Sequence, residues 1–355
     1  MAGGVGSRFW PLSTPSCPKQ FIDILGCGRT LIQLTMERFE SICPPENVWV
    51  VTNKSYVDTV AEQLPSIQPS HILAEPAARN TAPCIAWACW RIRKEDPCAN
   101  VVVTPSDAAV MDPVEFRRVI RNALSFSASS DSIVTIGIKP SRPETGYGYI
   151  EQGLPSTSSL TGASAGPDAS GEILHVRAFK EKPDLELARK YLDSGTFLWN
   201  AGIFVWNVKT IVSSLRTYCP SLSSAMDRME ESGDIEGVFP QCEKISIDYA
   251  VMEPASLEGR VFTHPADFGW SDLGNWASLY DKLQCDEDGN ASVGNVRLFE
   301  CRDCLVHAEN AEMVVIQGLE GYIISEHDGR LLVCRRSEEQ RIRDFSSNLM
   351  PAGKH

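Results

Sequence analysis

Short apolar runs rich in β-branched residues alternate with helical patterns through the first part of the chain. The runs lie at 48–52, 71–74, 101–104 and 133–138, and the helical patterns lie at 55–64, 81–95 and 113–127. A strand that is apolar on both faces must be covered on both sides, which is typical of a parallel sheet flanked by helices. The pattern predicts an α/β fold with a Rossmann-like, doubly wound, mostly parallel sheet. Such sheets bind ligands outside the carboxyl ends of their strands.

The pattern of predicted strands and helices changes near residue 290. Further strand-like pieces follow one another with little helix between them, before a charged helix at 337–345; these pieces lie at 296–299, 305–307, 313–316, 322–325 and 331–334. This change predicts a boundary between a domain at 1–285 and a small β-rich carboxyl-terminal domain at 286–355. Residues 153–171 hold one charge and few apolar side chains, so we expect a mobile surface loop there.

Composition narrows the class of protein. The 355 residues carry a net charge of −13, which argues against nucleic acid or an anionic membrane surface as a partner. No apolar run reaches the roughly 20 residues of a membrane span, and no signal peptide is recognisable, so we expect a cytoplasmic protein. The twelve cysteines have no framework spacing and are expected to be reduced. Cys301 and Cys304 are expected to be strand or turn residues, not metal ligands.

A glycine-rich segment, Gly3-Gly4-Val5-Gly6-Ser7-Arg8, opens the chain and is followed by Lys19. Glycines let backbone N–H groups approach phosphate oxygens, and the two cations can neutralise phosphate charge. Without the cations, a tight turn would be the simpler interpretation. The segment fits neither the Walker A pattern nor the dinucleotide-binding fingerprint, which disfavours the common ATPase and dehydrogenase classes.

Residues 3–21, ending in Pro18-Lys19-Gln20-Phe21, resemble the signature of the sugar-1-phosphate nucleotidyltransferases, and specifically of the mannose-1-phosphate guanylyltransferases. The resemblance recurs in order along almost the whole chain. The further matching segments are Glu75 to Pro83, Pro105-Ser106-Asp107, Arg142 to Tyr149, Glu181-Lys182-Pro183, Trp199 to Gly202 and Asp267 to Gly274.

The resemblance implies transfer of GMP from GTP to mannose 1-phosphate, with release of pyrophosphate and dependence on Mg²⁺. It also implies roles for individual residues, which are as follows: Arg8 and Lys19 are catalytic; Ala2, Gly3, Gly4, Gly6, Arg79 and Asn80 bind the nucleotide; Gly146, Glu181, Lys182, Asn200 and Gly202 bind the sugar phosphate; Asp107 and Asp272 bind the metal. The resemblance further implies that the carboxyl-terminal domain resembles a short left-handed β-helix. A homodimer is expected.

The residues themselves leave simpler interpretations open. Asp107 could be a helix N-cap, and Asp272 could begin a helix at 273–282. Asn80 or Thr81 could merely cap the helix at 81–95. Glu181 and Lys182 could be a solvated charge pair on an extended backbone, because Pro183 disfavours the helical conformation at the residue before it. The single glycines could serve turn geometry alone.

Two departures from the family pattern bear on these expectations. The family has a buried strand immediately before its glycine segment, so we expect the natural protein to begin upstream of Met1. Ala108 stands where the family usually has His after the metal-binding aspartate, which alters the support of Asp107. The alternatives are therefore a transferase for another sugar phosphate and nucleotide, such as glucose 1-phosphate with UTP or dTTP, and a non-catalytic protein that senses GDP-mannose.

Overall fold

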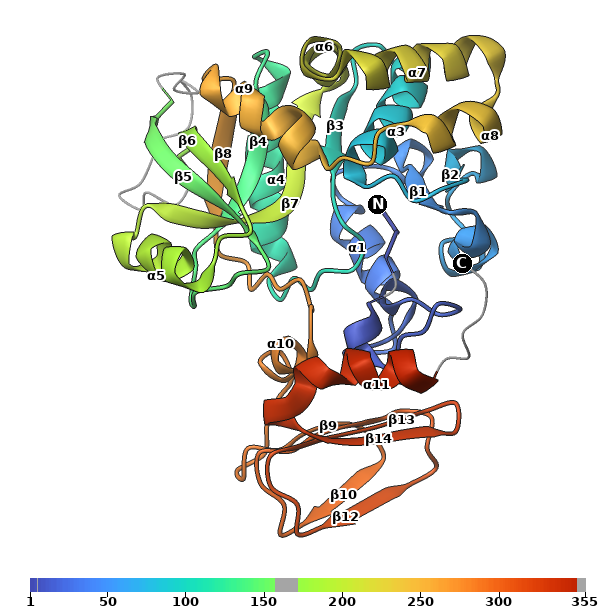
Figure 1. The fold of residues 1–355 in the computed structure, drawn as a ribbon, viewed down its shortest axis with the longest axis vertical. Coiled ribbons are helices and arrows are strands. Elements are labelled where there is room, and N and C mark those ends of the chain that lie inside the picture. Colours follow the sequence, from blue (N-terminus) through green and yellow to red (C-terminus); the bar gives the residue numbers. More distant parts are fainter. Residues whose placement is uncertain (5, 157–171, 350–355) are drawn as a thin grey trace. The chain divides into compact units, whose positions relative to one another are not determined.

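The computed structural model describes residues 1–4, 6–156 and 172–349, and its chain divides into two compact units (Figure 1). The larger unit comprises Met1, 38–105 and 110–270, and the smaller unit comprises 2–37, 106–109 and 271–355. The expected domain boundary near residue 285 stays a prediction, because a compact unit can draw on several chain segments. Most of the loop predicted at 153–171 lies outside the described residues; its first residues belong to a strand that ends at Pro155.

A six-stranded mixed sheet forms the centre of the larger unit, in the order β3-β7-β4-β8-β6-β5. Strands β4 and β8 are parallel, and the other neighbours are antiparallel. Strands β1 and β2 form a separate parallel pair. The strands are β1 (Val50–Asn53), β2 (Ile72–Glu75), β3 (Asn100–Val103), β4 (Ile133–Ile138), β5 (Gly148–Pro155), β6 (Leu174–Glu181), β7 (Phe197–Asn207) and β8 (Val261–Ala266).

Helices of this unit pack on the sheet and on one another. Helix α4 contacts β3, β4, β7 and β8, helix α9 contacts β6 and β8, and helices α3, α6 and α7 pack together. The helices that lie wholly in this unit are α2 (Val57–Gln63), α3 (Thr81–Glu95), α4 (Pro113–Ala128), α5 (Leu185–Ser194), α6 (Val208–Tyr218), α7 (Pro220–Ser232), α8 (Ile235–Val238) and α9 (Glu253–Leu257). Side chains of α3, α6, α7 and β7 meet in one apolar core, which includes Trp87, Trp206 and Met226.

The expected elements of this unit are present with small shifts at their ends. The four apolar runs correspond to β1, β2, β3 and β4, and the three helical patterns correspond to α2, α3 and α4. Asp112 caps α4, because its carboxylate accepts from the N–H groups of Val114 and Glu115. Asn80 occupies the N-cap position of α3 but makes no side-chain capping hydrogen bond.

The smaller unit contains short parallel strands stacked in coils. Val296 pairs with Val314 and Leu305 pairs with Ile323, so these two steps both span 18 residues, whereas Ala291 pairs with Leu305, a step of 14 residues. Its elements are β9 (Ala291–Gly294), β10 (Val296–Phe299), β11 (Leu305–Ala308), β12 (Val314–Gln317), β13 (Tyr322–His327), β14 (Arg330–Arg335), α10 (Trp276–Tyr280) and α11 (Ile342–Leu349). The chain passes between the units within α1 (Leu31–Phe39). Cys301 and Cys304 are buried in the apolar core of the coils.

The α/β class and the β-rich carboxyl-terminal region are therefore confirmed. The coiled strands carry the stacking that a short left-handed β-helix would need, and that finer description stays a prediction. All twelve cysteines are free. Within the described part of the chain, no helix has the length and apolar character that crossing a membrane requires.

Candidate active site

Three segments that are distant in sequence meet in the smaller unit. Ala109 and Ser271 form an antiparallel bridge, with N–H to O distances of 2.8 and 3.1 Å in the two directions. This bridge brings the segment of Asp107 to the segment of Asp272. Ala108, between Asp107 and the bridge, is buried. The long-range pairing therefore places both predicted metal ligands in one region of the unit.

The Lys19 ammonium joins the same region and is almost fully buried. Its Nζ lies 3.1 Å from Asp107 Oδ2, and it donates to the carbonyl oxygens of Asp272 at 2.6 Å and Leu273 at 2.9 Å. An ammonium has three N–H groups, and these three oxygen acceptors can occupy all of them. Lys19 therefore fixes the relative positions of the two aspartate segments. We refer to Lys19, Asp107 and Asp272 as the lysine–aspartate group.

The glycine-rich segment packs against Lys19. Gly6 has φ +68°, and a Cβ on it would lie 2.9 Å from Lys19 Cβ, so only glycine fits there without displacement. The Gly6 carbonyl accepts hydrogen bonds from the Ser13 hydroxyl and, at 3.0 Å, from the Phe9 N–H. Ala2 is buried, and its carbonyl accepts from Gln20 Nε2. A Cβ on Gly3 or Gly4 would meet no atom within 4 Å, which leaves space beside their backbone.

Arg8 lies at the same turn as Asp272. Its guanidinium donates to the Gly274 carbonyl at 3.4 Å, and Asp272 Oδ1 accepts from the Gly274 N–H at 3.0 Å. Asp272 does not begin a helix: α10 starts at Trp276 and is capped by Asn275. Nor does Asp107 cap one, because the next helix along the chain is α4, which Asp112 caps. The structure thus removes the simpler interpretations of both aspartates.

The lysine–aspartate group fits a divalent cation by its donor chemistry. Carboxylate oxygens are hard ligands, and Mg²⁺ is usually held by one or two carboxylates together with substrate phosphates. Asp107 keeps about a third of its side-chain surface exposed and meets Lys19 through Oδ2. Among the described residues, no cluster of three or more His, Cys, Asp or Glu side chains is placed to hold a metal alone. Two carboxylates completed by phosphate oxygens are therefore the arrangement that fits.

The predicted nucleotide-binding residues Arg79 and Asn80 lie in the larger unit, in front of α3. Asn80 has φ +63°, an unfavourable conformation for a residue with a side chain. The Arg79 guanidinium donates to the Pro240 carbonyl, and its buried Nε has no hydrogen-bond partner among the residues that the structure describes. The next residue, Thr81, accepts from the Ile247 N–H at 2.9 Å. These contacts tie the Arg79 segment to the chain just before residue 248.

The predicted sugar-phosphate residues form a second cluster in the larger unit. Lys182 Nζ lies 2.9 Å from Glu181 Oε1, and this hydrogen bond raises the Lys182 pKa. The extended backbone predicted for Lys182 is wrong: its φ is +45°, and its N–H donates to the Tyr147 carbonyl at 3.2 Å. A Cβ on Gly148 would lie 2.6 Å from Glu181 Oε2, so that glycine admits the carboxylate. Gly146 donates to Glu144 Oε1.

Asn200 belongs to a bulge of β7 in the same unit. Gly137 of β4 pairs with Asn200 and Thr135 pairs with Phe204, so β7 has extra residues between these pairs. Gly202 lies in this bulge with φ +68°. Asn200 Oδ1 accepts from the Gly202 N–H at 3.1 Å and from Thr135 Oγ1 at 3.2 Å. The Asn200 side chain therefore links the bulge of β7 to the neighbouring strand β4 by hydrogen bonds.

Asp248 completes this second cluster, and the sequence reasoning missed it. Its Oδ1 accepts from Asn200 Nδ2 at 3.0 Å, and burial, with Glu181 nearby, raises its pKa to about 6. Asp248 begins a π-helical turn (Asp248–Met252) that leads into α9. Within Ser246-Ile247-Asp248-Tyr249, it reads as an ordinary helix start. The signal that could have found it is an acidic residue between apolar neighbours.

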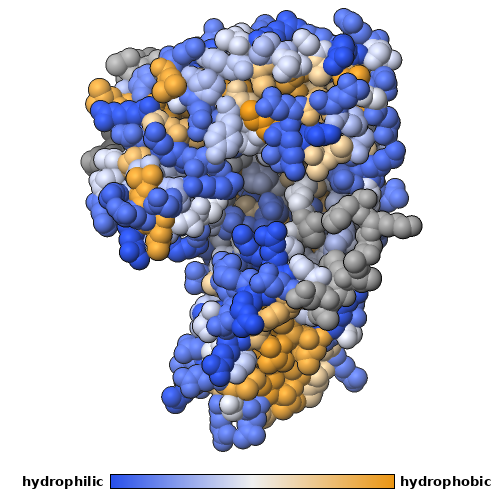
Figure 2. Space-filling view, in the orientation of Figure 1, coloured by the Kyte–Doolittle hydropathy of each residue, from blue (hydrophilic) through white to orange (hydrophobic). Residues whose placement is uncertain are grey.

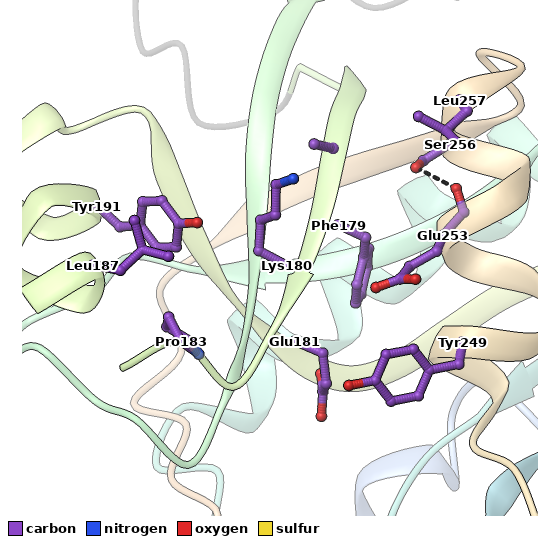
Figure 3. Close-up of a pocket in the computed structure, with 11 residues that line it drawn as sticks. Phe179, Lys180, Glu181, Pro183, Leu187, Tyr191, Tyr249, Glu253, Ser256 and Leu257 are labelled. Atoms are coloured by element: carbon purple, nitrogen blue, oxygen red, sulfur yellow. Dashed lines mark hydrogen bonds between the residues drawn. The ribbon is translucent and has the colours of Figure 1, made fainter. Parts of the chain in front are cut away.

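An open cavity of about 440 Å³ lies beside Glu181, between β6, α5 and α9 (Figure 3). The Glu181 carboxylate and the Tyr249 hydroxyl approach each other at one end of it, and Phe179 and Glu253 line the wall near α9. Lys180 and Tyr191 lie on the side of α5. The cavity thus presents aromatic walls with charged groups, and it shares Glu181 with the second cluster.

Comparison with known proteins agrees with this geometry. Residues 1–289 match the sequence model of the Nucleotidyl transferase family. The chain therefore belongs to this family. Its members generally use a divalent metal ion.

The relatives narrow the family further. The chain is 35% identical over 364 residues to the xanthan biosynthesis protein XanB of Xanthomonas campestris pv. campestris, covering 100% of this chain and 73% of that protein. It is 33% identical over 368 residues to the mannose-1-phosphate guanylyltransferase of Escherichia coli K12, with the same two shares. Among solved structures, the mannose-1-phosphate geranyltransferase of Thermus thermophilus has a TM-score of 0.86 and 28% identity, covering 98% of this chain and 97% of that one.

Proposed function

We propose that this protein transfers GMP from GTP to α-D-mannose 1-phosphate, giving GDP-mannose and pyrophosphate. The observation that carries the proposal is the lysine–aspartate group, in which Lys19 joins the Asp107 carboxylate to the backbone of Asp272 beside a glycine-rich segment, in a chain of the nucleotidyl transferase family. The relatives named for this activity supply the substrate pair. A sugar-phosphate oxygen forms a bond to the α-phosphorus of GTP, and the bond from that phosphorus to the bridging oxygen of pyrophosphate breaks.

The chemistry requires positioning and charge neutralisation more than covalent help from the protein. Asp107 and Asp272 would hold Mg²⁺, which neutralises charge on triphosphate oxygens when bound. Arg8 contributes a second cation to the triphosphate. Lys19 holds both aspartate segments in place, and its own charge lies beside them. No nucleophilic side chain is needed.

The remaining proposed contacts belong to the nucleotide and the sugar phosphate. The backbone of Ala2, Gly3, Gly4 and Gly6 binds phosphate, and Arg79 and Asn80 bind the nucleoside; the unpartnered Nε of Arg79 supports a polar ligand there. Lys182 binds the phosphate of the sugar, and Glu181 accepts from its hydroxyls. Gly146, Asn200 and Gly202 shape the same subsite, and the strained φ of Lys182 supports a functional role for it.

The decisive assay is pyrophosphate release with a panel of nucleotides and sugar 1-phosphates, with and without Mg²⁺. We expect the highest kcat/KM with GTP and mannose 1-phosphate, loss of turnover without divalent metal, and at least a hundredfold loss in Asp107→Asn. A higher kcat/KM with UTP or dTTP and glucose 1-phosphate would identify the other transferase. Binding of GDP-mannose without turnover of any pair would identify a sensor.

We further propose that the protein is a homodimer. Apolar side chains gather on the surface over β10, β12 and β14 (Figure 2). The exposed large apolar residues of this region are Phe299, Met313, Val315, Leu331 and Val333. Exposed apolar side chains that gather in one patch are typical of a contact surface, and a second copy of the chain can cover it. Light scattering should give twice the monomer mass, and the Val315→Glu/Val333→Glu variant should be monomeric. Leu257→Glu, at an exposed apolar residue outside the patch, is the control; a monomeric wild type contradicts the proposal.

A further inference from the structure

The Asp248 side chain is a carboxylate in a buried position, where an uncharged side chain would be easier to bury. Its neighbours desolvate the carboxylate, and the groups that hydrogen-bond to it are uncharged: Asn200 Nδ2, the Ser246 side chain and the backbone of Asp248 itself. An ionised carboxylate is costly in such surroundings unless something stabilises its charge. The charged groups near it are Glu181, which is also acidic, and Lys182. The positive charge of the Lys182 ammonium therefore acts on two carboxylates, those of Asp248 and Glu181.

The hydrogen bonds around Asn200 determine which way its amide faces. Its Oδ1 accepts from the Gly202 N–H, which can only donate, so this atom is the oxygen. Nδ2 must then be the atom that faces Asp248, and Asp248 must accept. The amide is held from β4, from the β7 bulge and from the turn of Asp248. Removing Asp248 leaves the amide nitrogen without this acceptor.

We propose that Asp248 is a positioning residue of the sugar-phosphate subsite, which fixes the Asn200 amide and, beside Glu181 and Lys182, sets where the hydroxyls of the hexose bind. This inference rests on the proposed function. The turn that carries Asp248 also carries Tyr249, which meets Glu181 at the end of the cavity in Figure 3. A shift of this turn would move the Asn200 amide and the cavity wall together.

Steady-state kinetics of the full-length protein test the proposal. Asp248→Leu keeps the shape of the side chain but loses the acceptor, and we expect it to raise the KM for mannose 1-phosphate about tenfold or more. The KM for GTP should stay within about twofold of wild type. Asp248→Asn keeps an acceptor for Asn200 Nδ2, and its KM for mannose 1-phosphate should stay within about threefold. Asp248→Ala, which also lacks an acceptor, is the substitute if the leucine variant does not fold.

A double-mutant cycle separates positioning from a general structural role. In an Asn200→Ala background, Asp248→Leu should change the KM for mannose 1-phosphate by less than about twofold, because the group through which it acts is gone. Asp227 offers a matched control, since it accepts from Trp90 Nε1 at 2.8 Å elsewhere in the larger unit. Asp227→Leu should leave the ratio of the two KM values unchanged.

Any of the following results would overturn the inference: equal effects of Asp248→Leu on both KM values, no effect on either, or an asparagine variant as impaired as the leucine variant. An additive cycle with Asn200→Ala would do the same. Failure of the proposed function itself looks different, because the wild-type protein would then form no product from GTP and mannose 1-phosphate at any concentration.

Discussion

Lys19→Met should destabilise the smaller unit far more than loss of an ordinary lysine. Methionine fills most of the same space, so the substitution chiefly removes the charge and the N–H donors. Asp107 then loses its cation, and the carbonyls of Asp272 and Leu273 lose a donor. Breaking a buried ion pair costs roughly 3–5 kcal/mol, and an unsatisfied buried acceptor about 1–3 kcal/mol. Because water reaches the exposed third of Asp107, the ion-pair cost falls to about 1 kcal/mol, and with the buried Leu273 carbonyl left unsatisfied we expect a total of about 2–4 kcal/mol.

Lys54→Met is the matched control. Lys54 pairs with Glu236 at 2.7 Å, but both side chains are 68% exposed, so its loss should cost no more than about 1 kcal/mol. Urea unfolding followed by circular dichroism gives the free energies. Hydrogen exchange with mass spectrometry locates the change, because the Ala109 and Ser271 N–H groups form the bridge that Lys19 supports. Equal destabilisation by the two variants, with unchanged exchange at both bridge residues, would refute the reasoning.

Three further outcomes follow from single contacts. Gly6→Ala should destabilise the protein by at least about 1 kcal/mol more than Gly28→Ala, as measured by urea unfolding. Both glycines have positive φ, but only at Gly6 would the new methyl group meet Lys19. Equal effects of the two substitutions would contradict this reasoning. Gly148→Ala should raise the KM for mannose 1-phosphate about tenfold by displacing Glu181, and an unchanged KM would remove Glu181 from the subsite. The Asp248 pKa is raised from 3.8 to about 6, so its stabilising contribution is complete below pH 4 and is lost as the pH rises through 6. Relative to Asp248→Asn, the wild type should lose about 2–3 kcal/mol of stability between pH 4 and pH 7, and a difference that does not change with pH would speak against a buried carboxylate.

Local patterns predicted much of the fold. The apolar runs that became β1, β2, β3 and β4 are recognisable because a strand covered on both faces has no polar alternation. Strand β7 was not predicted, although its sequence from Phe197 to Asn207 is almost wholly apolar. Asn200, Ala201 and Gly202 interrupt its apolar pattern in the middle, so the local sequence does not show one continuous strand.

The candidate site was predictable as a set of residues but not as an arrangement. The family resemblance selected Lys19, Asp107 and Asp272, yet the contacts that hold them depend on the bridge between Ala109 and Ser271, which no local pattern records. The turn at Lys182 likewise depends on a partner far along the chain, the Tyr147 carbonyl, which outweighs the preference that Pro183 imposes. Asp248 is missed for the same reason, since only Asn200 identifies its role.

The smaller unit is formed by chain segments that the ribosome makes at very different times. Lys19 is translated early, yet two of the oxygens that surround its ammonium belong to residues 272 and 273. While the ribosome is still adding the intervening two hundred and fifty or so residues, this ammonium must stay in water or find temporary acceptors. A nascent chain released before residue 272 therefore could not assemble the lysine–aspartate group, however well its larger unit had folded.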